Sequence, residues 1–174
     1  MAAKSKHGKN AEQAKPPEPY RIAATPGRQT ALAAAAYLFV TILLTWPLIF
    51  KMNSSVYGPY DHATTDLFAA VYQNFWWPAK AVFGLHGSPF FNPLQAAPFG
   101  TNMNFVNFTG FPAIPISGVF GAVFAMNLII ILNLALAGLG MFLLVRHVTR
   151  NAAAGFIAGL IFAFCPNMLV RSYT

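Results

Sequence analysis

Two aspartates, Asp61 and Asp66, are the first candidates for chemistry in this sequence. They lie in the stretch "YGPYDHATTDLFAAVYQNFWWPAK", and the only other acidic residues are Glu12 and Glu18 near the N-terminus. A carboxylate beside aromatic groups at a membrane surface is partly desolvated, which raises its proton affinity. Such a group can act as a general base or hold a cation. Asp66 and Asp61 are therefore candidate catalytic residues.

Each aspartate also has a simpler interpretation. Asp66 would stand in the first turn of a helix, where the helix dipole favours its charged form, so it can serve as a capping carboxylate. Asp61 follows Gly58 and Pro59 and suits a turn. The residue types alone leave both interpretations open.

A short amphipathic helix over residues 65–82 is expected to present the polar side chains that follow. Thr65 can cap its start, and apolar residues recur at a spacing of four along one face: Leu67, Val71, Phe75 and Ala79. Pro78 is expected to kink or end the helix, which would lie along the membrane surface. Four residues on and beside its other face are candidate substrate-binding residues: Gln73, Trp76, Trp77 and Lys80.

Other chemistries find less support in the sequence. His62 and His86 lack the paired spacing of a zinc site, and no glycine-rich phosphate loop precedes a helix. The residues themselves therefore predict no metal site. Cys165 is the single cysteine, so the chain forms no internal disulfide.

The composition is typical of an integral membrane protein. Of 174 residues, 56% are apolar and only 9% are charged, and the mean hydropathy is +0.52. The formal net charge is +7, but six of the 11 basic residues precede the first apolar run. They form a basic tail next to the membrane, and no nucleic-acid partner is expected.

The predicted fold class is all-α and integral to the membrane, with three transmembrane helices and an outer loop that carries the short surface helix. A span needs roughly 20 apolar residues. Pro112 and Pro115 indicate that part of the second apolar region is interfacial or re-entrant. The predicted segments are a disordered tail (1–29), three spans (30–50, 124–145 and 152–165), the outer loop (51–110), the interfacial segment (111–123), a turn (146–151) and the end (166–174).

The distribution of basic residues predicts the orientation. The outer loop has only Lys51 and Lys80, whereas Arg146 and Arg150 lie in the short turn. The positive-inside rule then places the tail and this turn in the cytoplasm and the outer loop outside the plasma (inner) membrane. A cleaved signal peptide is the rival interpretation, but the long charged region and the absence of a clear cleavage site favour an uncleaved anchor.

Four glycines in the second and third predicted spans could allow close helix packing: Gly138, Gly140, Gly155 and Gly159. Gly155 and Gly159 form a GxxxG pattern. The alternative is that glycines are simply frequent in membrane helices.

The order of the motifs from Thr30 onward resembles the N-terminal region of prokaryotic polytopic glycosyltransferases of the GT-C fold. In that family the first outer loop reads roughly G-D-x-x-D-x-L, W-W, N-P-F-F and Y-P-x-G-T-N. The matching pieces here are Gly58, Asp61, Asp66-Leu67, Trp76-Trp77, "SPFFNPL" and "APFGTN". The similarity continues through "NLIIILNLALAGLGMFLLVRHVTRNAAAGFIAGLIFAFCPN", where the family shows N-L, G-L-G-M, a basic turn and A-G-L-I-F-A-F-S-P.

The resemblance implies a function and a role for each aspartate. In that fold an acidic residue of the first outer loop acts as catalytic base, or positions the acceptor or a divalent metal ion. The sugar comes from a polyprenyl-phosphate carrier in the membrane. Asp66 matches the loop aspartate best, and Asp61 is the second choice.

Three helices are too few to enclose such a carrier. We therefore expect either an N-terminal piece of a glycosyltransferase or a short relative without catalysis, which would act as a scaffold with other membrane subunits. Membrane lipids are expected partners in either case. A channel or transporter is disfavoured because the predicted spans contain no ionisable residue.

Overall fold

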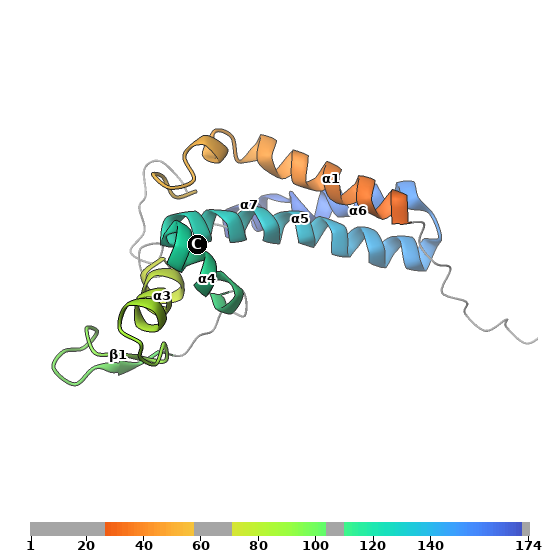
Figure 1. Ribbon diagram of the computed structural model, residues 1–174. Helices are drawn as coiled ribbons and strands as arrows, with labels where there is room; N and C mark the ends of the chain where they lie inside the picture. Colours follow the sequence, from red (N-terminus) through yellow and green to blue (C-terminus); the bar gives the residue numbers. More distant parts are fainter. Residues whose placement is uncertain (1–26, 58–70, 104–109, 172–174) are drawn as a thin grey trace, which may run out of the picture.

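The computed structural model describes residues 27–57, 71–103 and 110–171, and for the last two of these, Val170 and Arg171, the backbone alone. This part of the chain is mostly helical, as predicted (Figure 1). Its elements are α1 (Gly27–Leu44), η1 (Leu48–Phe50), η2 (Tyr72–Trp76), α3 (Trp77–Ala79), η3 (Lys80–Gly84), β1 (Phe91–Asn92), β2 (Thr101–Asn102), α4 (Gly110–Phe120), α5 (Ala122–Thr149), α6 (Ala152–Ala163) and α7 (Pro166–Arg171).

Two helices, α1 and α5, are long and apolar enough to cross a membrane. The 28 residues of α5 extend about 42 Å, which exceeds a hydrocarbon core of about 30 Å. The 12 residues of α6 extend only about 18 Å, because the helix ends at Ala163, before Pro166. The predicted third span, 152–165, is therefore a shorter helix than expected.

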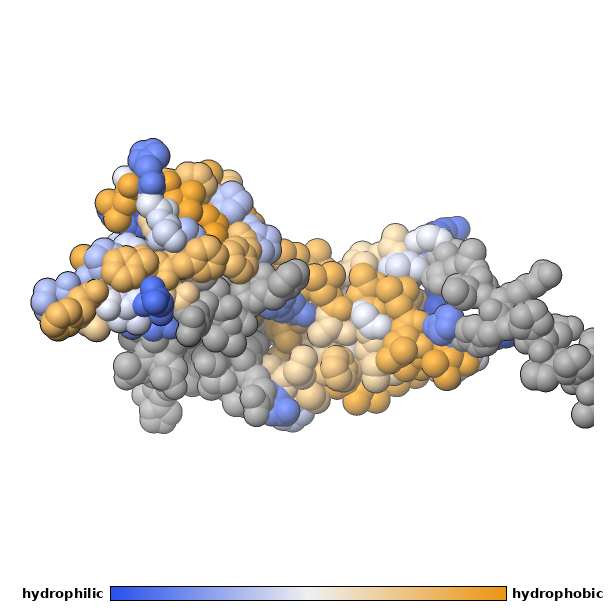
Figure 2. Space-filling view, turned by 90° about the horizontal axis from the view of Figure 1, so that it is seen from below, coloured by the Kyte–Doolittle hydropathy of each residue, from blue (hydrophilic) through white to orange (hydrophobic). Residues whose placement is uncertain are grey.

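Helices α1, α5 and α6 lie side by side and form a bundle (Figure 1). Tyr37 of α1 is fully buried at its centre, and its hydroxyl donates a hydrogen bond of 3.0 Å to the carbonyl of Phe156 in α6. The two rings stack with centroids 5.3 Å apart. Apolar residues cover most of the visible surface of the bundle (Figure 2).

Three of the four predicted packing glycines lie where helices approach closely. A Cβ on Gly159 would collide with the hydroxyl of Tyr37 and lie 2.6 Å from the carbonyl oxygen of Gly138. A Cβ on Gly155 would lie 2.8 Å from the carbonyl oxygen of Phe142. Gly140 differs, since a Cβ there would meet nothing within 4 Å among the described atoms.

The first helix differs from the predicted span of 30–50 at both ends. It begins at Gly27, inside the stretch expected to be disordered tail, and it ends at Leu44. Pro47 cannot continue an α-helix because it has no amide N–H. The chain leaves the helix through Thr45, whose hydroxyl donates to the carbonyl of Thr41 at 2.9 Å, and then forms η1.

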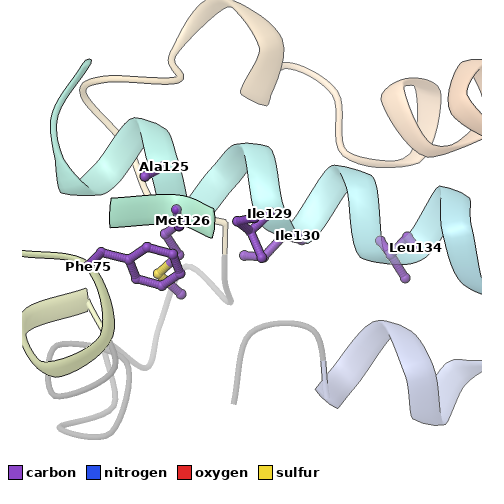
Figure 3. Close-up of a cluster of buried hydrophobic side chains, with 7 residues drawn as sticks. Phe75, Ala125, Met126, Ile129, Ile130 and Leu134 are labelled. Atoms are coloured by element: carbon purple, nitrogen blue, oxygen red, sulfur yellow. The ribbon is translucent and has the colours of Figure 1, made fainter. Parts of the chain in front are cut away.

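Outside the bundle, residues 71–103 and α4 pack on the first turns of α5 and form a second unit, which we call the head (Figure 1). Its core joins Phe75 of η2 and Ala113 of α4 to one face of α5: Ala125, Met126, Ile129, Ile130 and Leu134. Figure 3 shows the ring of Phe75 beside Met126. Val71 packs against the same cluster, so two residues of the predicted apolar face, Val71 and Phe75, pack into this core.

Two features of the head add detail to the predicted outer loop and interfacial segment. After the helical part, β1 and β2 form a short antiparallel ladder in which Phe91 pairs with Asn102 and Asn92 with Thr101. The interfacial segment 111–123 is mostly the helix α4, which contains Pro115. Gly121 then reverses the chain into α5 with a φ of 92°, a conformation that favours glycine.

Candidate functional site

The helical segment of the head consists of η2, α3 and η3 (72–84). An open cleft of about 310 Å³ lies between this segment and the turn from α4 to α5. Trp76, Lys80 and Phe83 line it from the helical segment. Its other residues come from that segment and from the opposite wall: Ala79, Gly84, Ser117, Gly118, Gly121 and Ala122. The described part of the chain thus brings two predicted substrate-binding residues, Trp76 and Lys80, to one cleft.

The cleft owes its shape to small residues on α4 and its neighbouring turn. A Cβ on Gly118 would lie 2.5 Å from the ring of Phe83, so a larger residue would push that ring aside. The ring lies against the backbone of α4 and forms one wall. Gly84 differs, since a Cβ there would lie 3.4 Å from the Cδ of Lys80, an ordinary van der Waals contact.

A buried hydrogen bond fixes the distance between the two walls. The hydroxyl of Ser117 donates to the backbone carbonyl of Phe75 at 2.8 Å, and Ser117 is only 6% exposed. A buried bond of this kind is costly to leave unmade, since the carbonyl would then face an apolar core. Ser117 therefore holds α4 against the helical segment that carries Trp76 and Lys80.

The helical segment has an unusual backbone. η2 and η3 are π-helices, in which the N–H of Trp77 bonds the carbonyl of Tyr72 and that of Leu85 bonds Lys80. Such wide turns are rare in proteins, and those that occur often lie at functional sites. The helix does not end at Pro78 but continues to Gly84. Its winding changes from π to α at Trp77, just before this proline. Of the two expected effects of Pro78, an end of the helix is therefore not seen.

A network of rings and amides supports Trp76 from the side away from α4. The ring of Tyr72 stacks on Trp76 with centroids 5.2 Å apart and planes inclined by 20°. The hydroxyl of Tyr72 accepts a hydrogen bond of 2.9 Å from the side-chain amide of Asn92 in β1. Asn92 is fully buried, and its Oδ1 accepts from the backbone N–H of Leu94 at 2.9 Å. The short hairpin thus braces the indole of Trp76.

Asn127 joins the first turn after α1 to the start of α5. Its Nδ2 donates to the carbonyls of Met52 at 2.9 Å and Ser55 at 2.7 Å, and its Oδ1 accepts from the N–H of Tyr57 at 3.2 Å. The side chain is fully buried, and these bonds use both donors and one acceptor position. Asn127 therefore fixes the path of residues 52–57, the last described before the stretch with Asp61.

The remaining predicted site residues lie elsewhere. Asp61 and Asp66 fall outside the described residues. Trp77 is only 1% exposed and packs with Ala81 and Met103, on the side of the helix away from the cleft. Gln73 is half-buried and does not line the cleft.

Sequence reasoning missed three polar residues on which the geometry depends: Ser117, Asn127 and Asn92. Asn127 carries a signal that could have found it, because it is an amide between Met126 and Leu128 in an apolar helix, a signal that the exposed Asn133 of the same helix shares. A polar side chain in such a place needs hydrogen-bond partners. Ser117 and Asn92 lie in stretches rich in Gly, Pro and Asn, where polar residues give no comparable signal.

The electrostatic character of the described site is cationic. Residues 27–57, 71–103 and 110–171 contain no acidic residue, and Lys80 is exposed at the cleft. Within the same segments no group of three or more His, Cys, Asp or Glu residues could hold a metal ion. The described part of the site can therefore bind an anionic ligand that also has an apolar surface for Trp76 and Phe83.

Comparison of the chain with models of protein families, with curated proteins and with solved structures finds no match.

Proposed function

We propose that this chain is the N-terminal region, or a short relative, of a GT-C type membrane glycosyltransferase. The reaction would move a sugar from a polyprenyl-phosphate donor to an acceptor on the extracytoplasmic side. The support is the resemblance in the order of its motifs from Thr30 onward. The single structural observation that carries the proposal is the cleft that places Trp76 and Lys80 together.

The proposed setting is the plasma (inner) membrane, with the N-terminus in the cytoplasm. Helices α1 and α5 are the first two spans. The third span is the segment 152–165, which begins with α6, and residues 166–174 follow it on the extracytoplasmic side. The skew of basic residues toward the tail and the 146–151 turn supports this orientation.

The contents of the cleft suit a lipid-linked sugar phosphate. Lys80 supplies a mobile ammonium group that can contact a phosphate, and lysine is a frequent phosphate ligand in proteins. Trp76 is 39% exposed and Phe83 is 53% exposed, so both rings offer apolar surface to a ligand. Ser117 and Asn92 hold the two walls in place without the ligand.

Asp66 would be the general base of the reaction, with Asp61 as the second candidate. Its carboxylate would take the proton from an acceptor hydroxyl while that oxygen attacks the anomeric carbon of the sugar. The bond from that carbon to the phosphate oxygen would break, and the polyprenyl phosphate would leave. A divalent metal ion held by these aspartates is the alternative role that the family resemblance implies.

The Lys80→Gln variant tests the donor site. Removing a charged hydrogen bond to phosphate should raise KM for the polyprenyl-phosphate sugar about 10- to 100-fold, with a smaller change in kcat. The matched control is Lys51→Gln, which removes an exposed charge from the turn after α1 and should leave KM unchanged. Equal KM values for both variants would contradict this donor site.

A non-catalytic scaffold is the second candidate, and one observation favours it. The bundle exposes large apolar side chains along α1 and α6, among them Phe39 at 67% and Ile161 at 67%. These sides could pack against other membrane subunits. Co-purification of the chain in a stable complex, with sugar transfer absent from that complex, would select the scaffold.

A further inference from the structure

Basic residues gather at the end of the bundle opposite the head. Ala33 and Phe142 belong to one buried cluster, and Tyr37 lies against Gly138, so α1 and α5 run antiparallel. This register brings Arg28, at the start of α1, level with Arg146 near the end of α5. Figure 1 shows the start of α1, the end of α5 and the start of α6 at the same end of the molecule.

No acidic residue in the described part of the chain balances this charge. His147 and Arg150 lie in the same turn of chain, and α6 begins here with Asn151, whose side chain accepts from the N–H groups of Ala153 and Ala154. The N-termini of α1 and α6 add partial positive charge through their helix dipoles, and the C-terminus of α5 at the same end offsets part of it. This end of the bundle is therefore a cationic surface that includes Arg28 and Arg146.

Arg146 is the best-positioned cation of this surface. Its guanidinium carbon lies 5.5 Å from the ring centroid of Phe142, which is buried, and the missing side chain of Gly155 leaves room for its stem. Its Nη1 is buried and has no hydrogen-bond partner. Arg146 as a whole is half-buried, and its guanidinium carries five N–H donors, so the side chain can still present donors to an anion at the surface.

We infer that this basic end binds the headgroup of an anionic phospholipid, with Arg146 and Arg28 contacting its phosphate. A phosphodiester at the membrane surface offers the oxygen acceptors that Arg146 lacks within the protein, and the guanidinium fork matches their geometry. Basic pockets between membrane helices on the cytoplasmic side commonly bind such headgroups. The inference rests on the proposed membrane orientation but not on sugar transfer.

The test is lipid selection by the whole chain in nanodiscs made of phosphatidylcholine mixed with phosphatidylglycerol. Native mass spectrometry would measure how many molecules of each lipid remain bound after release from the disc. The wild-type chain should retain phosphatidylglycerol in preference, and Arg146→Gln should lower that preference about fivefold. Arg146→Lys, which keeps the charge but not the fork, should lower it less.

Two further variants keep the result interpretable. Arg28→Gln changes an exposed residue that is not needed for packing, so its expected loss of preference would not be due to misfolding. Lys51→Gln removes one positive charge at the other end of the bundle and should leave the preference unchanged. Wild-type preference in both Arg146→Gln and Arg28→Gln would overturn the lipid site. A separate sugar-transfer assay would show whether the proposed function fails or stands independently.

Discussion

Asn127 is the residue that most directly ties the turn after α1 to α5. It bonds three backbone groups between Met52 and Tyr57, and no water-exposed surface remains on it. Two carbonyls and one N–H would lose their partner if the amide were removed. The path of residues 52–57 depends on this anchoring.

The Asn127→Leu variant should therefore destabilise the protein and loosen this turn. Buried backbone groups left without partners cost about 1–3 kcal/mol in the free energy of unfolding. Trypsin cleavage after Lys51, which is exposed, should become faster in the folded protein. Unfolding in mixed micelles and a time course of trypsin digestion measure the two effects.

The matched control is Asn133→Leu, the same change on the same helix. Asn133 is exposed and faces away from the turn, so its replacement should alter neither stability nor the cleavage rate appreciably. If the two leucine variants behaved alike, Asn127 would not hold the turn as described.

At the residue scale, two of the four candidate substrate-binding residues line the cleft, whereas the residues that build the cleft were not foreseen. Lys80 was proposed from its place on the polar face of the amphipathic helix, and Trp76 as part of the Trp76-Trp77 pair. Trp77 was not separable from Trp76 by this pattern, yet it is buried, since adjacent positions on a helix point in different directions. Ser117 acts across 42 residues of sequence, and local patterns carry no information about such a pairing.

At the scale of the elements, close approach of α1, α5 and α6 depends on glycine. Gly159→Ala should destabilise the bundle, because its Cβ would collide with the hydroxyl of Tyr37 and press on the carbonyl of Gly138. The carbonyl is backbone and cannot move without shifting α5. Overpacking of this kind costs about 1–3 kcal/mol, which thermal unfolding in detergent would detect.

Gly140→Ala provides the comparison on α5. A Cβ there meets no described atom within 4 Å, and alanine favours a helix over glycine by about 1 kcal/mol. We expect this variant to be neutral or slightly stabilised. A larger loss of stability at Gly140 than at Gly159 would contradict the helix packing.

The sequence predicted most helices but placed several of their ends wrongly. Apolar length identified α1 and α5 because long uninterrupted hydrophobic runs have few alternative structures. The predicted span of 30–50 runs past Pro47, whereas α1 stops at Leu44. The π-helical winding of η2 and η3 was not predictable, since it leaves no local sequence signal, and η2 packs against α4 and α5, which lie far away in the sequence.

At the scale of the whole molecule, our proposal places the bundle in the membrane and the head in the aqueous space outside it. The bundle has an apolar surface, and the head carries the cleft at one end of α5 (Figures 1 and 2). The cationic surface lies at the other end. This polarity suits a protein that crosses a membrane with the head outside and the basic end in the cytoplasm.

Cysteine labelling tests this orientation. In a Cys165→Ser background, Ser88→Cys in the head should react with a membrane-impermeant thiol reagent added outside intact cells, because Ser88 is exposed. Ser5→Cys in the tail should react only after the membrane is permeabilised. Labelling of Ser5→Cys from outside intact cells would contradict the proposed topology, because it would place the N-terminus outside.

The most direct test of the central claim is sugar transfer by the Asp66→Asn variant in membranes that contain a polyprenyl-phosphate sugar. The amide keeps the size of the carboxylate but removes its basic oxygen. If Asp66 is the general base, the transfer rate should fall about 10²- to 10⁴-fold while the protein remains folded and inserted, and Asp61→Asn should have a milder effect. A helix-capping role predicts a small loss of stability and unchanged transfer, because asparagine also suits a helix start. Near-normal transfer by Asp66→Asn would contradict the catalytic assignment.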